Sequence, residues 1–394
     1  MLVLGAAGLA GPWLFLRANG YHGDPISTAA LSGLAILGAA FLLAWSAEVA
    51  QMDISQGLAL AFLALIAVLP EYSVDMYFAW KAAEDPSYAP FAVANMTGAN
   101  RLLIGVGWSL VVILHWWRRR AKCVELDRSH VIELSVLALA TVYAFVIALK
   151  GTLTLVDAIL LVGLFLVYVV AVSRLPNDEP ELLGPALSIA SLPKLKRRGV
   201  TLALFVYAGI AIIASAEPFS EGLVKTGDLL GVEEFLLVQW LAPLASEAPE
   251  FVVAALFALR GHPAMALRTM ISSKVNQWTL LVGMLPIVYS VGLGELSPFP
   301  LDGRQIQEIV LTAAQSAFAV VILGRFRVTV RDAAVLITLF LVQLAFPWGI
   351  GRYAFSAAYI GLAVWLAVRD IERRNIILKA PARLVRVLRF GLSE

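Results

Sequence analysis

The chain has 394 residues, of which 60% are hydrophobic and only 15% are charged, whereas soluble domains carry roughly 25% charged residues. A soluble fold cannot bury so much apolar surface, so the composition predicts a helical bundle in a lipid bilayer. The single cysteine excludes a disulfide framework and a thiolate metal cluster. The net charge of +2 gives no indication of a nucleic-acid partner.

Apolar segments recur along the chain at a length of about 17–25 residues, which spans a hydrocarbon core of roughly 30 Å as a helix. The longest polar stretch, Ser173 to Arg198, is too short for a separate soluble domain. The first apolar run lacks a basic start and a convincing cleavage site, so we interpret it as a helix and not a signal peptide. We therefore predict an all-α, polytopic membrane bundle of about twelve helices, over residues 2–17, 28–49, 56–81, 88–116, 129–149, 152–172, 199–215, 232–259, 264–291, 305–323, 332–348 and 353–368.

The basic residues are distributed unevenly over the loops between these helices. With a cytoplasmic N-terminus, one set of alternate loops and the tail hold about 22 Lys and Arg, and the other set, which includes Arg304 and Arg352, holds about 6. Because positive loops stay in the cytoplasm, we expect a multi-pass protein of the cell membrane with both termini cytoplasmic. The tail from Arg369 to Phe390 alternates basic and apolar residues, which suits a helix lying on anionic lipids. A solvated, positive-inside anchor is the simpler interpretation.

Two pairs of segments resemble each other. Leu65-Ile-Ala-Val-Leu-Pro-Glu71 is similar to Ala242-Pro-Leu-Ala-Ser-Glu-Ala-Pro-Glu250, and each is followed by a short polar loop and a second apolar helix. In these second helices, matching Gly107 with Gly283 superposes three polar pairs, which are Thr97 with Ser273, Asn100 with Asn276, and Arg101 with Gln277.

The motifs fall on predicted helices three and four and again on helices eight and nine. An offset of five helices is odd, so the second copy enters the membrane from the opposite side. The sequence thus predicts two inverted-topology repeats of five helices, the architecture in which secondary transporters hold their substrate near the bilayer midplane. We expect five parts, namely an extra N-terminal helix (1–27), a first repeat (28–172), a cytoplasmic linker (173–198), a second repeat (199–351), and an extra helix with a basic tail (352–394).

Each repeat places a Pro-Glu pair, Pro70-Glu71 or Pro249-Glu250, within a predicted membrane helix. A proline inside a helix frees carbonyl oxygens of the preceding turn, and within lipid such oxygens persist only where they are buried or face a wet cavity. Intramembrane acids are expensive and are functional by default, although a glutamate paired with Lys or Arg for packing is the structural alternative. The pairs therefore predict a cation site of hard oxygen ligands, to which Asp75 and Glu247, one helical turn away, are weaker candidates.

These residues resemble the cation/calcium exchanger superfamily, which includes sodium/calcium, potassium-dependent and proton/calcium exchangers. Its repeats carry a Gly-Thr-Ser-x-Pro-Glu-like helix and then a Gly-Ser-Asn-x-x-Asn/Asp-like helix, and the resemblance covers roughly residues 56–116 and 232–291. The resemblance implies that Glu71 and Glu250 are the paired acids. It also places the family's remaining ligands on other positions of this chain, which are Ala67, Val68, Ser246, Glu247, Thr97, Ser273, Arg101 and Gln277.

Two basic residues depart from the family pattern. Arg101 stands where the family has an amide or carboxylate ligand, and a guanidinium cannot coordinate a metal ion. We expect Arg101 to pair with Glu71 or Asp75, as a built-in counter-ion. Lys274 could do the same for Glu247 or Glu250, or extend to the cytoplasmic interface.

The resemblance implies a secondary active cation antiporter that works by alternating access, with calcium, sodium or protons as its ions and no cofactor. A sodium/proton exchanger of the same fold is an alternative. A sensor or scaffold in which Arg101 and Lys274 neutralise the acids is another. An enzyme is not expected, because the sequence contains no zinc-binding His-Glu-x-x-His helix and no phosphate loop. The sequence leaves the oligomeric state open.

Overall fold

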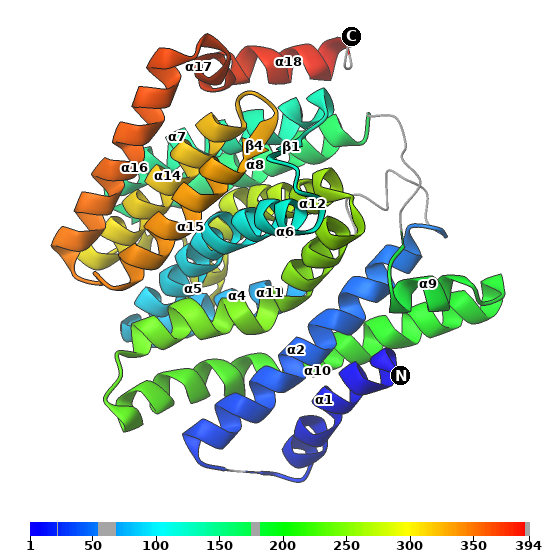
Figure 1. Ribbon diagram of the computed structural model, residues 1–394. Helices are drawn as coiled ribbons and strands as arrows, with labels where there is room; N and C mark the ends of the chain where they lie inside the picture. Colours follow the sequence, from blue (N-terminus) through cyan, green and yellow to red (C-terminus); the bar gives the residue numbers. More distant parts are fainter. Residues whose placement is uncertain (22, 54–67, 175–181, 391–394) are drawn as a thin grey trace. The chain divides into compact units, whose positions relative to one another are not determined.

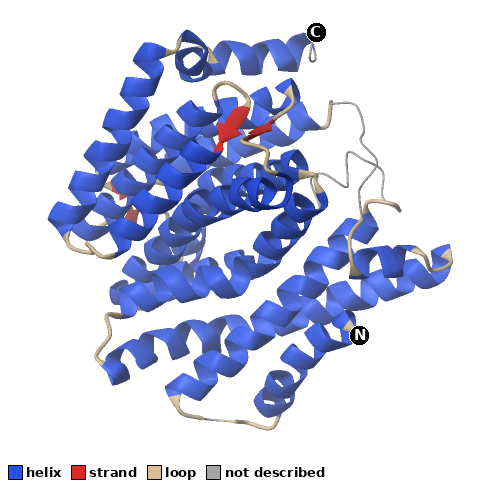
Figure 2. Ribbon diagram, viewed as in Figure 1, coloured by secondary structure: helices blue, strands red, loops and turns tan. Residues whose placement is uncertain are grey.

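The structure, a computed structural model, describes residues 1–21, 23–53, 68–174 and 182–390. Helices make up nearly all of this part, and the few strands are very short (Figure 2). Eight of the described helical segments are long and apolar enough to cross a membrane, as expected of a multi-pass membrane protein. They are Pro25–Ala50, Pro86–Arg119, Arg128–Lys150, Leu155–Val172, Lys194–Leu230, Glu234–Arg260, Gly303–Leu323 and Gly349–Arg369.

Each predicted helix overlaps a helix of the structure, although some ends differ: the predicted helix 332–348 runs past the helix Val330–Leu344, and the predicted helix 152–172 begins in the strand Thr152–Leu153. Part of the predicted helix 56–81 lies outside the described residues. The largest difference concerns the predicted helix 199–215, because α10 runs over Lys194–Leu230. At 1.5 Å per residue this 37-residue helix is about 55 Å long and exceeds the hydrocarbon core. The count of twelve crossings stays a prediction.

The chain divides into two compact units. The first comprises residues 1–78 and 176–250, and the second comprises residues 79–175 and 251–394. Two helices, α4 (Leu69–Glu84) and α11 (Glu234–Arg260), begin in the first unit and continue into the second. These are the helices that carry the Pro-Glu pairs.

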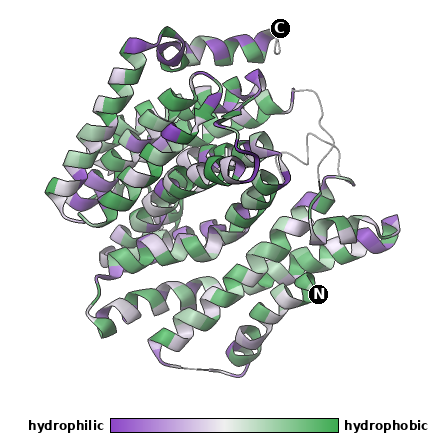
Figure 3. Ribbon diagram, viewed as in Figure 1, coloured by the Kyte–Doolittle hydropathy of each residue, from purple (hydrophilic) through white to green (hydrophobic). Residues whose placement is uncertain are grey.

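The first unit is built on α1 (Leu2–Ala18), α2 (Pro25–Ala50), the short α9 (Pro185–Ala190) and α10, and α2 and α10 lie side by side (Figure 1). Residues along α2 and α10 are mostly hydrophobic (Figure 3).

Small residues allow the helices of the first unit to approach closely. A Cβ atom added to Gly38 would lie 2.4 Å from the carbonyl oxygen of Ala6, and one on Gly222 would lie 2.8 Å from the backbone nitrogen of Ala29. Membrane helices associate through such close packing because lipid provides no hydrophobic driving force between them.

The second unit contains most of the remaining helices. Two of them pass through a π-helical turn, at η2 (Leu103–Trp108) and at η4 (Gln277–Leu281). The helices of the unit are α5 (Ala89–Leu102), α6 (Ser109–Arg119), α7 (Val131–Lys150), α8 (Leu155–Val172), α12 (Pro263–Asn276), α13 (Val282–Leu293), α14 (Gly303–Leu323), α15 (Val330–Leu344), α16 (Gly349–Arg369), α17 (Ile371–Leu378) and α18 (Ala380–Phe390), with 3-10 turns η1 (Pro86–Tyr88) and η3 (Arg128–His130).

Two short antiparallel ladders connect the loops of the second unit (Figure 2). Strand β1 (Cys123–Glu125) pairs with β4 (Arg327–Thr329), and β2 (Thr152–Leu153) pairs with β3 (Phe299–Pro300). Each ladder therefore joins a strand from residues 123–153 to one from residues 299–329.

Helix caps recur at a spacing of 175 residues along the chain. Asp127 caps η3 and Asp302 caps α14, each through its side chain. Reciprocal capping boxes start α8 at Thr154 with Asp157 and α15 at Thr329 with Asp332. Such boxes satisfy two otherwise unpaired backbone donors, so the same local chemistry starts equivalent helices in both halves.

Candidate functional site

The first Pro-Glu pair lies at the start of α4. This helix begins at Leu69, so Pro70 is its second residue, where a proline costs no helical hydrogen bond. Residues 54–67, which precede it, lie outside the described residues, so the expectation that this proline lies inside a longer membrane helix stays a prediction. Glu71 is 2% exposed and Asp75 is fully buried one turn later, which places both acids on one helix face.

The second Pro-Glu pair lies within a continuous helix. Pro243 and Pro249 are both inside α11, as predicted for Pro249. Ser246 and Glu247 are buried, and the Ser246 hydroxyl donates to the carbonyl oxygen of Ala242, at 3.1 Å. Glu250 follows Pro249 directly, and its Oε2 atom is buried with no hydrogen-bond partner among the described residues.

The acids of α4 and α11 were expected to converge on one site. Among the described residues no group of three or more His, Cys, Asp or Glu side chains is arranged to hold a metal ion. The convergence of Glu71 and Glu250 therefore stays a prediction. Ala67, a position carried over from the family, lies outside the described residues.

The polar residues of α5 lie immediately before the π-helical turn η2. Thr97 is fully buried and donates to the carbonyl oxygen of Val93, at 2.7 Å. The Asn100 amide donates to the carbonyl oxygen of Met96, also at 2.7 Å. π-Helical turns are rare and occur frequently at functional sites. The backbone geometry of η2 therefore indicates a candidate functional segment independently of the sequence motif.

The equivalent residues of α12 lie immediately before η4, or at its first residue. Gln277 opens η4 and is 1% exposed, and Ser273 is partly buried. The Lys274 ammonium is fully buried and donates to the side-chain oxygen of Asn100, at 2.6 Å, and it lies over the Trp278 ring, 4.4 Å from the centroid. Lys274 therefore does not extend to a membrane interface, and it joins the two polar segments of the second unit.

Arg101 forms a buried ion pair that the sequence analysis did not anticipate. Its Nη2 atom lies 2.7 Å from Oε2 of Glu308 on α14. Oε1 of the same carboxylate lies 2.7 Å from Nε of Arg352 on α16. The expected pairing of Arg101 with Glu71 or Asp75 stays a prediction, and Glu308 is the partner within the second unit.

Arg352 and Arg304 had been assigned to loops. The structure corrects both assignments, because Arg304 lies in the first turn of α14 and Arg352 in the first turn of α16. The predicted helices 305–323 and 353–368 began too late because the polar first turn of each helix was interpreted as part of a loop. Helix starts tolerate such residues when their side chains find partners, as Arg352 does with Glu308.

A second buried acid, Glu133 on α7, corresponds to Glu308. Each lies six residues after the capping aspartate of its half, Asp127 or Asp302, and each is 2% exposed. Glu133 lies near His130, and one of its oxygens has no hydrogen-bond partner among the described residues. Both acids fall inside predicted membrane helices at a spacing of 175 residues, and that spacing is the signal that could have found them.

Comparison with known proteins places the chain among ion exchangers. The sequence profile of the family described as sodium/calcium exchanger protein matches twice, over residues 25–174 and 200–349. The sodium/calcium exchanger MaX1 of Methanosarcina acetivorans is 28% identical over 89 residues, which cover 23% of this chain and 25% of that exchanger.

Solved structures extend the likeness to almost the whole chain. The crystal structure of the H+/Ca2+ exchanger CAX is 44% identical, covers 98% of this chain and 97% of its own, and superposes with a TM-score of 0.93. The structure of native YfkE is 16% identical over 90% of this chain and 98% of its own, with a TM-score of 0.61, and shows the same fold.

Proposed function

The chain belongs to the sodium/calcium exchanger protein family, and from this premise we propose that it is a secondary active antiporter that exchanges calcium for protons across the cell membrane. The observation that carries the proposal is the likeness of nearly the whole chain to a proton/calcium exchanger. The family and its structural relatives are transporters and not enzymes. Calcium and the proton are then transported substrates, and no cofactor takes part.

In this proposal Glu71 and Glu250 carry the cation. Oxygen atoms are the ligands that calcium prefers, and each glutamate can alternatively hold a proton. Asp75 and Glu247 provide further carboxylate oxygens, and Ser246, Thr97, Ser273 and Gln277 complete the candidate ligand set. The burial of Glu71, Asp75 and Glu247 supports the assignment, because a buried acid in a membrane protein is costly unless it has a function.

The proton is the proposed counter-ion because of the basic residues. Arg101 and Lys274 are buried in the helices that follow the two Pro-Glu helices. Neither side chain can serve as an oxygen ligand for a sodium ion, whereas a proton on a glutamate needs no ligand from any other residue. The likeness to a proton/calcium exchanger supports the same choice.

Alternating access is proposed to follow from an inverted repeat. The family profile matches the two halves separately, their helix caps recur at a spacing of 175 residues, and an offset of an odd number of helices would invert the second copy. Both helices that carry the glutamates continue from one compact unit into the other. Movement of one unit would therefore act directly on α4 and α11.

The proposal is tested by ion flux in proteoliposomes with calcium, sodium and pH gradients varied separately. We expect calcium uptake driven by an outward proton gradient, abolished in Glu71→Gln and in Glu250→Gln and unaffected by sodium. Glu84→Gln is the matched control, because Glu84 is an exposed glutamate at the far end of α4. Sodium-driven proton movement without calcium flux would favour the sodium/proton exchanger. Correctly folded protein without any cation flux would favour the sensor or scaffold.

We also propose that α17 and α18 lie on an anionic membrane surface. Ile376, Ala380 and Leu384 are buried, and α18 packs on α7 and α8. The outer face exposes Ile371, Leu378 and Val385 together with Arg386 and Arg389, and hydrophilic and hydrophobic residues alternate there (Figure 3). Such helices bind anionic lipid through apolar insertion and charge.

Hydrogen exchange of the full chain in vesicles tests the membrane contact. We expect α18 to exchange more slowly in vesicles containing phosphatidylglycerol than in phosphatidylcholine alone. The difference should disappear in the double variant Arg386→Gln, Arg389→Gln. Equal exchange of the wild type in both lipids would indicate a solvated anchor.

A further inference from the structure

A buried Arg-Glu-Arg triad connects three helices of the second unit. Arg101 of α5 is 1% exposed, Glu308 of α14 is 2% exposed and Arg352 of α16 is 7% exposed. The two oxygens of the Glu308 carboxylate each lie 2.7 Å from a guanidinium nitrogen, one from each arginine. With all three groups ionised, two positive charges share one negative charge, and the triad carries a net charge of +1.

We propose that Glu308 and Arg352 are positioning residues that fix the guanidinium of Arg101 and, through its charge, set the affinity and selectivity of the exchanger for cations. This inference rests on the proposed antiport function. It adds two residues on helices that carry none of the family's motif positions. It also assigns a role to Arg101, the buried basic residue that departs from the family pattern.

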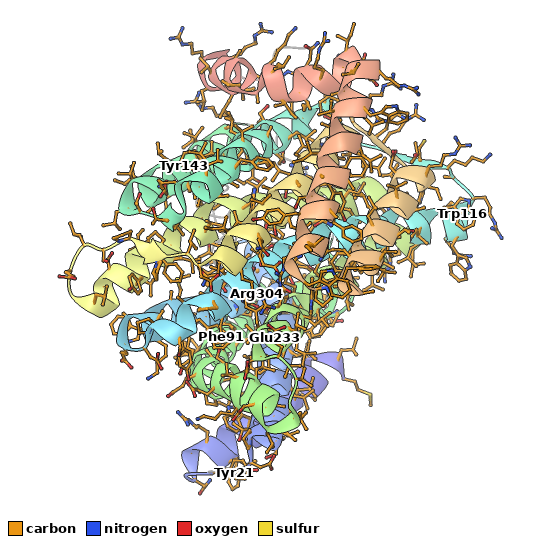
Figure 4. All side chains as sticks on the ribbon, turned by 90° about the vertical axis from the view of Figure 1, so that its left-hand side faces the viewer. Tyr21, Phe91, Trp116, Tyr143, Glu233 and Arg304 are labelled. Atoms are coloured by element: carbon orange, nitrogen blue, oxygen red, sulfur yellow. The ribbon has the colours of Figure 1, made fainter. Side chains whose placement is uncertain are left out.

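The position of Arg352 is determined by the packing of α16 on α14. Nη1 of Arg352 donates to the side-chain oxygen of Gln307, at 2.9 Å, and a Cβ atom on Gly349 would lie 3.0 Å from that same oxygen. Further along the two helices, the rings of Phe318 and Tyr359 are 6.0 Å apart. The two helices thus hold Arg352 against Glu308 from both sides of the contact. Arg304, labelled in Figure 4, precedes Glu308 by one turn of α14 and adds a further positive charge to this region.

The position of Arg101 is determined by backbone contacts as well as by the ion pair. Its Nε donates to the carbonyl oxygen of Thr97, at 3.4 Å, and its own carbonyl oxygen accepts from Nε2 of Gln315 on α14, at 3.5 Å. A guanidinium remains charged throughout the physiological pH range. Removing one partner of a buried ion pair leaves an uncompensated charge and is strongly unfavourable. Arg101 is therefore a fixed and permanent cation.

The electrostatic consequence differs in sign for the two positioning residues. Charges interact over long distances where the surroundings exclude water. Neutralising Glu308 raises the net charge of the triad and should weaken cation binding, whereas neutralising Arg352 lowers the net charge and should strengthen it. A purely structural role would give losses of the same sign for both variants.

Arg352 comes from a part of the chain that follows the family match. The profile ends at residue 349, and α16 spans Gly349–Arg369. The helix shared with the family, α14, supplies Glu308, and the following helix supplies the second arginine. Arg352, which lies outside the repeated core, thus contributes to the net charge of the triad around Arg101.

The test measures calcium uptake in proteoliposomes at a fixed pH gradient, and calcium binding by calorimetry in detergent. For Glu308→Gln we expect the half-saturating calcium concentration to rise roughly 3–10-fold, and for Arg352→Gln we expect it to fall by a similar factor, with increased competition by sodium. Arg352→Lys should restore the wild-type value. Arg369→Gln, which removes an exposed arginine at the other end of the same helix, is the matched control and should leave the value unchanged.

The outcomes separate this inference from the proposed function. Shifts of the same sign for Glu308→Gln and Arg352→Gln, or no shift in either, would overturn the inference while wild-type transport stands. A wild-type chain that neither binds nor transports calcium would overturn both. If Glu308→Gln does not fold, the comparison of Arg352→Gln with Arg352→Lys still decides, because only a charge effect gives tighter binding in the glutamine variant and wild-type binding in the lysine variant.

Discussion

The two halves of the chain share their backbone features and differ in their buried charges. In both halves a polar helix passes into a π-helical turn, at η2 and η4, and a capping box starts a later helix, at Thr154 and at Thr329. At equivalent positions of the two halves, however, the first half has Arg101 and the second half has Gln277.

The buried acids differ in the same way. Glu308 lies between two arginines, whereas Glu133 lies beside His130. Local backbone features therefore recur in both halves, whereas the buried charges distinguish them.

The largest expected effect tests which acid of α11 corresponds to Glu71. Glu250 shares the Pro-Glu motif with Glu71, but Glu247 lies 176 residues after Glu71, close to the spacing of the helix caps. We expect the motif to decide, so that Glu250→Gln abolishes calcium flux and Glu247→Gln reduces it roughly tenfold, as expected for the loss of one charged ligand. Flux in proteoliposomes gives the answer. The opposite order would show that the register of the helices, and not the proline, fixes the site.

A smaller effect is expected for the position at which the two halves differ most. Arg101→Asn removes a positive charge and supplies an amide oxygen, so we expect the half-saturating concentration of calcium or sodium to fall severalfold. Gln277→Asn, the matched change in the other half, keeps the amide and should change it less. Calorimetric titration with each cation measures both. Unchanged affinity in Arg101→Asn would show that this residue lies outside the cation cavity.

The capping boxes test the features that the two halves share. Thr154→Ala and Thr329→Ala each remove a side-chain cap, and each should lower the free energy of unfolding by about 1 kcal/mol. Asp157 also accepts hydrogen bonds from Lys150 and Tyr143, which keep it in place when Thr154 is lost. Thermal unfolding in detergent should therefore show the smaller loss for Thr154→Ala. A larger loss at Thr154 would mean that these extra contacts do not compensate.

The helices, the family and the repeated motifs were accessible from the sequence because each depends on a local pattern. Apolar length located the helices, and Pro249 was correctly predicted inside a helix. The start of α16 at Gly349 was missed because an apolar pattern does not reveal where a helix with a polar first turn begins.

The partners of the basic residues were not accessible from the sequence. Arg101 was expected to contact an acid of its own half, but Glu308 lies 207 positions later in the chain. The buried contact of Lys274 with Asn100 likewise joins residues 174 positions apart. Such pairs depend on how helices pack, and hydropathy carries no information about packing partners.

The smallest expected effect concerns a partly buried contact of the first half that has no counterpart among the described residues of the second half. Asp53, just after α2, accepts hydrogen bonds from Arg197, at 2.9 and 3.0 Å, and from Arg198, at 3.0 Å. Asp228, 175 residues later, is exposed. The hydrogen bonds from Arg197 lower the pKa of Asp53 to about 2, with partial burial opposing them and Arg198 assisting.

A lowered pKa means that the folded chain binds the proton of Asp53 less tightly than the unfolded chain does. Its contribution to stability is therefore complete above the ordinary carboxyl pKa and is lost as the pH falls from about 4 toward about 2. Asp53→Asn should lower the melting temperature at pH 7 slightly, by less than the cap variants, and should remove this acid-dependent loss. Asp228→Asn is the control and should change neither. An unaltered acid transition in Asp53→Asn would show that the two arginines do not join α10 to the end of α2 in solution.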